Sequence, residues 1–419
     1  MYVDAAFLAY YDKPERVRLR GLARNAATPV DVLLRLLDHP EDVRADVMRR
    51  PAWSDEAVDA VATHPRPAVR AVLAEAVGAS PEQRARLVDD PDRRVRWRLA
   101  EGPDRSRWAA AAPLPRWAYE RLAAEGDDLM RDLLANWCRW TPADIRAALR
   151  TGAAADPSGE ARNADGDAPL TRERAEELVR DESEWARTQA AADPALPADL
   201  VAVLAADPSP DVRLAVSMRP ELSEEQRAAV DYHVAPADRL TPLDWVTETT
   251  DPDELRRCVH SAHVALRRSS AYNPHLTPEL VAVLAADEDH AVRLLLCENH
   301  PDVPGEVVLQ TYLEAEVAGR GDLLDHPCFP RQGLASLADS PDPNARALVV
   351  LDPQAPAALI ERLSHDPDPR VRCRMAADER LPLDRLLALF DDPETTEAAA
   401  SNPNLPVDLM ERILADALP

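Results

Sequence analysis

The stretch LVAVLAADPSPDVRLAVSMRPELS at residues 200–223 contains the two parts of a repeated unit. Apolar residues at helical spacing over 200–206 predict a first helix. That helix is expected to end at Asp-Pro, because proline lacks an N–H group and disfavours helical geometry in the residue before it. Pro210 suits the first turn of a second helix, where a missing N–H group is not needed. The stretch therefore predicts two short helices per unit.

The same pattern recurs along most of the chain. LIERLSHDPDPRVRCRMAADERLP occupies 359–382, and ELVAVLAADEDHAVRLLLCENHPDVP occupies 279–304. An arginine marks the phase at gaps of 26 residues, with slips of one or two and one stretch of 91 residues that holds degenerate units. The markers are Arg18, Arg44, Arg70, Arg96, Arg187, Arg213, Arg239, Arg267, Arg293, Arg320, Arg346 and Arg372. Since two short helices cannot bury their own apolar faces, the units must stack. The sequence predicts an all-α fold, an α-solenoid forming a right-handed superhelix of about fifteen two-helix repeats of roughly 26 residues.

Local signals within the units support this prediction. Helix starts carry the spacing of a capping box, in which a hydroxyl side chain binds the backbone three residues later. These pairs are Thr28 with Asp31, Ser80 with Gln83, Thr141 with Asp144, and Ser223 with Gln226. The phase arginines and the Asp-Pro aspartates recur from unit to unit, which a ligand site would not do. We therefore expect them to form a structural ladder of Arg–Asp and Arg–carbonyl hydrogen bonds.

The D-P-x-P-x-V-R and N-P-x-L-P elements resemble the variant leucine-rich repeat family, which is related in shape to HEAT-like solenoids. The resemblance covers most of the chain. It implies a curved superhelix in which α-helices alternate with short α or 3₁₀ helices, and it implies no activity. The founding pattern of that family includes a cysteine cluster for an iron–sulfur centre, and nothing in this sequence matches it.

Composition indicates a soluble protein in a reducing compartment. The five cysteines are scattered and odd in number, which argues against a disulfide framework. No apolar stretch is long enough for a membrane span, and no basic region precedes an apolar run at the N-terminus. Familiar catalytic and cofactor-binding motifs are absent. We expect a cytoplasmic, non-enzymatic protein without a cofactor or a membrane association.

Residues 151–170, TGAAADPSGEARNADGDAPL, interrupt the repeats and hold three of the eleven glycines. They predict a flexible loop or hinge between an N-terminal half at 1–150 and a C-terminal half at 171–419. The N-terminal half has a net charge of +1, the loop −3 and the C-terminal half −24. The acidic half has two interpretations, solvated turns and helix faces or a negative surface that attracts a basic partner.

Tryptophan and arginine gather near the end of the N-terminal half. Five tryptophans fall within 44 residues, and residues 93–150 have a net charge of +4 in an otherwise acidic protein. These residue types are enriched at interface hot spots, so the region predicts a surface for a protein or peptide partner. The alternative is that the tryptophans are core residues filling irregular repeats. The candidate residues are Trp97, Arg98, Arg107, Trp108, Trp117, Trp137, Arg139 and Trp140.

Two further interpretations stay open. Some HEAT-like solenoids are DNA glycosylases with Trp, Asp and Arg in the pocket, and Trp140, Asp144 and Arg139 supply these types. The net charge of −26 opposes phosphate binding, so a nucleic-acid partner is not expected. Cys258, His260 and His263 form C-x-H-x-x-H, in which two histidines on one helix face could hold a metal, although an incidental cluster is favoured. The preferred hypothesis is an intracellular scaffold.

Overall fold

The computed structural model describes residues 14–38, 41–103, 113–125, 127–138, 140–152, 170–235, 238–315 and 318–417. Over these ranges the chain forms helices and no strands, which confirms the all-α class. It divides into two compact units, unit 1 with residues 1–155 and 330–419, and unit 2 with residues 156–329. The predicted C-terminal half is 171–419, whereas residues 330–419 group with the N-terminal residues in the structure. The expected loop at 151–170 lies almost entirely outside the described residues.

Unit 1 contains helices from both ends of the described chain. The N-terminal group is α2 (Pro14–Arg24), α3 (Val30–Leu37), α4 (Glu41–Met48), α5 (Asp55–Ala62), α6 (Pro67–Ala74), α7 (Pro81–Ala85), α8 (Arg93–Glu101), α9 (Arg116–Glu125), α10 (Asp128–Asp132), the π-helix η1 (Leu133–Trp137) and α11 (Ala143–Gly152). The C-terminal group is η4 (Leu334–Asp339), α23 (Pro343–Ala347), η5 (Leu348–Leu351), α24 (Ala357–Leu363), α25 (Pro369–Ala376), α26 (Leu383–Asp391), α27 (Thr396–Ala400) and α28 (Val407–Ala417).

Unit 2 continues the alternation of short helices. Its helices are α12 (Arg172–Val179), α13 (Glu184–Ala192), α14 (Ala198–Leu204), α15 (Pro210–Ser217), α16 (Glu224–Ala229), α17 (Asp244–Thr247), α18 (Pro252–Val259), α19 (Val264–Ser270), α20 (Pro278–Ala285), α21 (His290–Asn299), α22 (Gly305–Glu314) and the 3₁₀ helix η3 (Ala318–Asp325). Several of these helices pack on the helix two places further along the chain, as α13 does on α15, α12 on α14, and α19 on α21.

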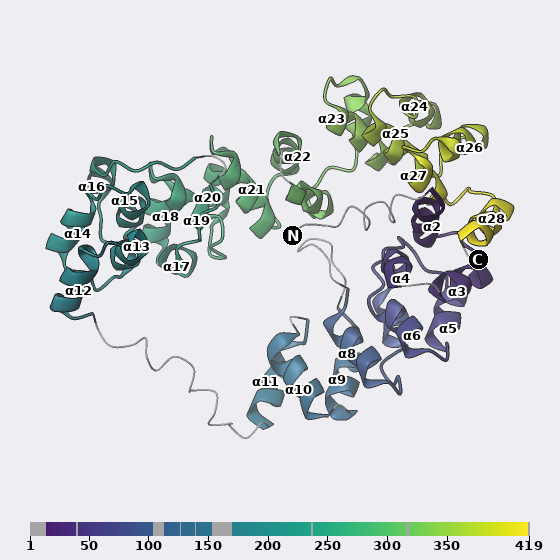
Figure 1. Cartoon of the computed structure of the whole chain (residues 1–419), viewed down its shortest axis with the longest axis horizontal. Coiled ribbons are helices and arrows are strands. Elements are labelled where there is room, and N and C mark those ends of the chain that lie inside the picture. The colour runs from purple at the N-terminus through teal and green to yellow at the C-terminus, as the bar shows by residue number, and fades with distance from the viewer. Residues whose placement is uncertain are drawn as a thin grey trace. The chain divides into compact units, whose positions relative to one another are not determined.

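The helices of unit 1 stack in rows (Figure 1). We call one of them the first row, and each of its members contacts the next in the order α23, α25, α27, α2, α4, α6 and α8. A neighbouring row contains α28, α3 and α5 in contact. In both rows, helices near the end of the described chain are followed by helices near its start.

Four of the phase arginines form the Arg–Asp pairs that the sequence predicts. The Arg70 guanidinium donates to both carboxylate oxygens of Asp90, over 2.7 and 2.9 Å, and to the carbonyl oxygen of His64 over 2.8 Å. Three more pairs with the same separation of 20 residues repeat this geometry. They are Arg187–Asp207, Arg267–Asp287 and Arg346–Asp366. These four arginines therefore each link a helix to an aspartate 20 residues later, as expected for the Arg–Asp bonds of the ladder.

The predicted helix starts are right at some positions and wrong at others. Proline occupies the first turn of α15, α23 and α25, and the capping boxes at Ser80 and Ser223 are both formed. The box at Thr28 is wrong, because α3 starts one residue later and the hydroxyl donates instead to backbone carbonyls of Leu22 and Asn25. The capping box predicted at Thr141 is also wrong, because α11 starts one residue too late, at Ala143.

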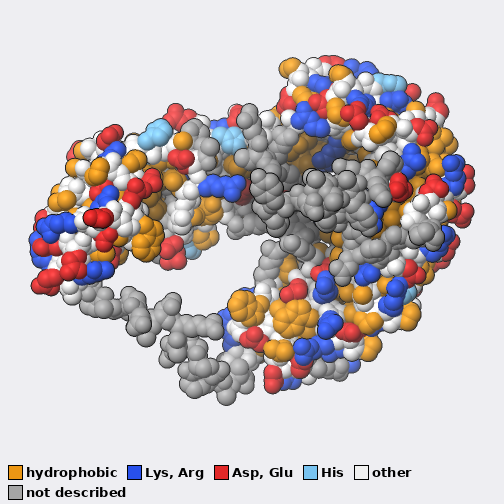
Figure 2. Space-filling view, in the orientation of Figure 1, with side chains coloured by type: hydrophobic (Ala, Val, Ile, Leu, Met, Phe, Trp, Pro, Cys, Tyr) orange, Lys and Arg blue, Asp and Glu red, His pale blue; other side chains and the backbone are white. Residues whose placement is uncertain are grey.

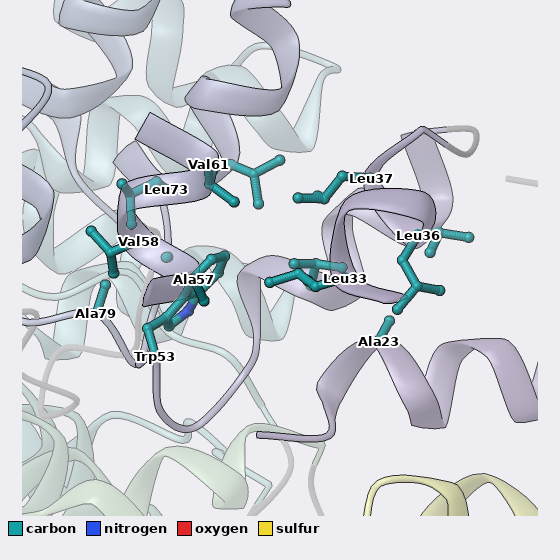
Figure 3. Close-up of a cluster of buried hydrophobic side chains, with 14 of the residues drawn as sticks. Ala23, Leu33, Leu36, Leu37, Trp53, Ala57, Val58, Val61, Leu73 and Ala79 are labelled. Atoms are coloured by element: carbon teal, nitrogen blue, oxygen red, sulfur yellow. The ribbon is translucent and has the colours of Figure 1, made fainter. Parts of the chain in front are cut away.

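Small and medium apolar side chains fill the space between helices. Leu33, Leu36 and Leu37 of α3 are fully buried. Figure 3 shows Leu33 and Leu37 on the side toward α5 and Leu36 beside Ala23 of α2. Trp53, which precedes α5, is 6% exposed in the same cluster. Each fully buried leucine stabilises the fold by about 2 kcal/mol relative to an exposed one. The packing of neighbouring helices in this cluster is thus driven mainly by burial of aliphatic side chains.

Candidate functional site

A surface groove crosses the first row of unit 1. One part, with a volume of about 630 Å³, is bounded by Arg44 and Met48 of α4 and by Arg94 and Arg98 of α8. Between these long side chains, α6 presents small residues, which include Ala68 and Ala71. The hollow exists because short side chains on the middle helix lie between long ones on its neighbours.

A second hollow of about 500 Å³ continues the groove toward α10. It shares Glu75, Arg94 and Arg98 with the first hollow and adds Trp97 and Leu129. We call the two together the α6–α8 groove. Around α8 to α11, Figure 2 shows hydrophobic side chains exposed beside arginines.

Arg94 is a charged side chain of the groove that lies beside apolar surface. Arg98 pairs with Glu75, and Arg93 pairs with Asp127 over 3.2 Å. Arg94 is exposed, and its side chain takes part in none of the ion pairs found between described residues. Leu129 is 51% exposed, although a leucine at a monomer surface usually gains free energy by burial. This combination suits a segment that brings a carboxylate and an apolar side chain.

The structure separates the predicted tryptophans. Trp97 lines the α6–α8 groove and packs partly against the core, and Arg98 lines the groove beside it. Trp117 on α9 and Trp137 on η1 are 52% and 76% exposed. Trp140 is partly buried against the core. The described tryptophans are therefore neither all core residues nor all surface residues. Arg107, Trp108 and Arg139 lie outside the described residues.

Sequence reasoning missed several groove residues. Ala68 and Ala71 have no chemical signature, and their effect depends on which helices flank α6. Leu129 and Met130 are both one helical turn from Leu133, so spacing alone does not say which is exposed. The structure buries Met130 and exposes Leu129. Arg94 could have been found, because it lies in the arginine-rich stretch that the sequence analysis singled out.

Trp140 and Asp144, the two described residues of the DNA glycosylase alternative, have other neighbours in the structure. The Asp144 carboxylate accepts two hydrogen bonds from Arg116, over 2.5 and 3.1 Å, at an exposed position on α11. The Arg116 guanidinium lowers the pKa of Asp144. Trp140 packs partly against the core. Asp144 is thus an exposed, ion-paired carboxylate, whereas a general base near neutral pH needs a raised pKa.

The candidate metal ligands Cys258, His260 and His263 do not lie on one helix. The expectation that His260 and His263 share a helix face is wrong, because α18 ends at Val259 and α19 begins at Val264. Cys258 is buried in a small core cluster with Val246 and Leu266. Among the described residues, no group of three or more His, Cys, Asp or Glu side chains is placed to hold a metal ion.

His263 has a structural role. Its Nδ1 accepts the backbone N–H of Ala265 at the start of α19, and its Nε2 lies 2.9 Å from Ser217 Oγ. Tyr232 stacks on the imidazole with ring centroids 4.2 Å apart. Because Nδ1 accepts, the proton of the neutral ring is on Nε2. Burial lowers the pKa of His263 to about 4, with further contributions from the charges of Arg227 and Arg267.

The cysteines should differ sharply in reactivity. Cys328 is exposed, whereas Cys258 and Cys297 are buried and burial raises their pKa values to about 11. Iodoacetamide at pH 7.5 is expected to alkylate Cys328 on the order of 100-fold faster than either buried thiol, because the thiolate is the reacting species. Peptide mass spectrometry over time measures the rates. Similar rates for all three would contradict the packing around Cys258 and Cys297.

Comparison with family models and with curated proteins finds no match to this chain. Within the described ranges, no helix is long and apolar enough to cross a membrane.

Proposed function

We propose that this protein is a non-enzymatic, cytoplasmic scaffold with the architecture of a variant leucine-rich-repeat α-solenoid, and that it binds a protein segment in the α6–α8 groove. The groove carries this proposal, since it brings exposed Arg94 and half-buried Trp97 of α8 beside exposed Leu129 of α10. The Arg–Asp ladder and the 26-residue phase support the solenoid of about fifteen repeats.

The groove favours a partner segment with acidic and apolar side chains. A carboxylate can pair with Arg94, and an apolar side chain can cover Ala68, Ala71 or Leu129. The acidic residues of 171–419 would act elsewhere, by attracting basic regions of the same partner and raising the association rate. Such attraction weakens as ionic strength rises.

Two substitutions in the groove should each weaken capture of the partner. Arg94→Glu and Leu129→Ala are expected to reduce affinity by about tenfold each, because central arginine and apolar contacts contribute on the order of 1–2 kcal/mol. The measurement is quantitative pull-down of full-length variants from nuclease-treated lysate of the native host. Both side chains are exposed, so thermal stability should not change.

Leu383→Ala is the matched control for Leu129→Ala. Leu383 lies on α26 in the same unit and is 49% exposed, against 51% for Leu129. Equal binding by wild type, Leu129→Ala and Leu383→Ala would contradict the groove. If the captured material depended on nucleic acid, it would disappear on nuclease treatment. A base-excision activity receives no support from the exposed Arg116–Asp144 pair.

A further inference from the structure

Helices from distant parts of the sequence meet inside the first row of unit 1. Helix α2 packs against α27 and α28, and α3 also contacts α28 (Figure 1). The residues that bond across this contact are more than 370 positions apart in the chain. We call it the α2–α27 joint, formed by Arg20, Gly21, Arg24 and Asn25 with Glu397, Ala400 and Asn402.

The joint uses the same hydrogen bonds as repeats that follow one another in the chain. Asn402 Nδ2 donates to the carbonyls of Ala376 and Asp378, over 2.9 and 2.7 Å, and its Oδ1 accepts from the backbone N–H two residues later. In unit 2, Asn273 makes the same three bonds to the preceding repeat and to its own turn. The asparagine is therefore a repeat-to-repeat connector.

Asn25 makes these three bonds across the joint. Its Nδ2 donates to the carbonyls of Ala400 and Asn402, over 3.1 and 2.6 Å, and its Oδ1 accepts the N–H of Ala27 over 2.9 Å. Asn25 is fully buried. The repeat that begins with α2 thus takes the position that the next repeat after α27 would occupy.

The α2–α27 joint combines close helix packing at Gly21 with ion pairs of Arg24. A Cβ atom on Gly21 would lie 2.1 Å from the carbonyl oxygen of Glu397 and 2.7 Å from Cβ of Ala400, so the helices approach as closely as glycine allows. Arg24 pairs with Glu397 over 2.8 Å and with the nearly buried Asp46 of α4 over 2.7 Å. One guanidinium therefore links α27, α2 and α4.

We infer that the α2–α27 joint is a non-covalent contact that continues the spacing of the repeats. It completes the first row by docking residues 14–38 onto residues 383–417 of the same chain, and we call this docked arrangement the clasp. At the other boundaries of the row, the chain itself connects the repeats. At the clasp, only packing and side-chain bonds hold them. Opening it would separate the two chain segments of unit 1 without breaking a repeat.

Gly21→Ala tests the clasp in the full-length protein, by hydrogen exchange with mass spectrometry. Gly21 lies within α2, where alanine alone should strengthen the helix by about 1 kcal/mol. A closed clasp predicts the opposite effect at a distance, with exchange in α27 and α28 accelerated roughly tenfold or more through local opening. Gly321→Ala is the control, because no atom lies within 4 Å of its added Cβ.

Asn25→Ala should also accelerate exchange in α27 and α28, whereas the equivalent Asn273→Ala should accelerate it only in unit 2. The inference is overturned if α27 and α28 exchange at the wild-type rate in both Gly21→Ala and Asn25→Ala. It is also overturned if the wild type is a dimer by light scattering and the bonds form between copies.

Discussion

Asp90→Ala is expected to lower the free energy of unfolding by about 3–5 kcal/mol, because it leaves a buried guanidinium without its counter-charge. Arg70 is 7% exposed and Asp90 is 6% exposed, and two hydrogen bonds join them. Two backbone carbonyls would still accept from Arg70, which does not replace the lost carboxylate. Urea denaturation followed by circular dichroism measures the loss.

The matched control is an Arg–Asp pair at the surface of the same unit. Arg86 pairs with Asp59, whose side chain is 71% exposed, and Asp59→Ala should cost less than about 1 kcal/mol. The double variant Asp90→Ala with Arg70→Met should recover much of the stability, since it removes the unpaired charge. Equal losses for Asp59→Ala and Asp90→Ala would contradict the structural role of the ladder.

Acid should destabilise unit 2 through His263. Its pKa in the folded state is lowered from 6.5 to about 4, so between these values the unfolded chain binds the proton more readily. The stabilising contribution is complete above pH 6.5 and is lost as the pH falls toward 4. The linkage amounts to about 2 kcal/mol between pH 7.5 and pH 5.

His263→Asn isolates this effect. Asparagine can still cap α19, as His263 does, but it does not titrate. The difference in stability between wild type and His263→Asn should shrink by about 2 kcal/mol on going from pH 7.5 to pH 5. Hydrogen exchange of α15 and α19 reports it locally. Parallel pH profiles for the two proteins would show that His263 is not held neutral by burial.

Much of the fold follows from local sequence chemistry. Asp-Pro pairs end helices, prolines such as Pro210 start them, and arginines spaced at the repeat length reach aspartates 20 residues away. The helix ends, the helix starts and the Arg–Asp pairs each involve residues that lie close together in the chain. The residue spacing therefore predicts the helices and the Arg–Asp ladder, but it does not fix a helix start to within one residue, as Thr28 and Thr141 show.

The order of stacking could not be predicted in the same way. Because the short helices resemble one another in sequence, the sequence does not say which helix packs on α2. The role of Asn25 appears only when Ala400 and Asn402 are seen beside it. The candidate site was predicted in part. Arg94, Arg98 and Trp97 lie in the stretch 93–150, which composition indicates. Ala68 and Leu129 contribute to the groove only because of the helices that surround them.

The central claim is that the α6–α8 groove holds a protein segment, and site-specific photo-crosslinking in the native host tests it most directly. A photo-reactive amino acid replaces Leu129 in one protein and Leu383 in another, which are similarly exposed. We expect one protein to be crosslinked from position 129 only, to be retained after nuclease treatment and to be lost when Arg94→Glu is added. Crosslinks that are equal from both positions, or that join position 129 to nucleic acid, would contradict it.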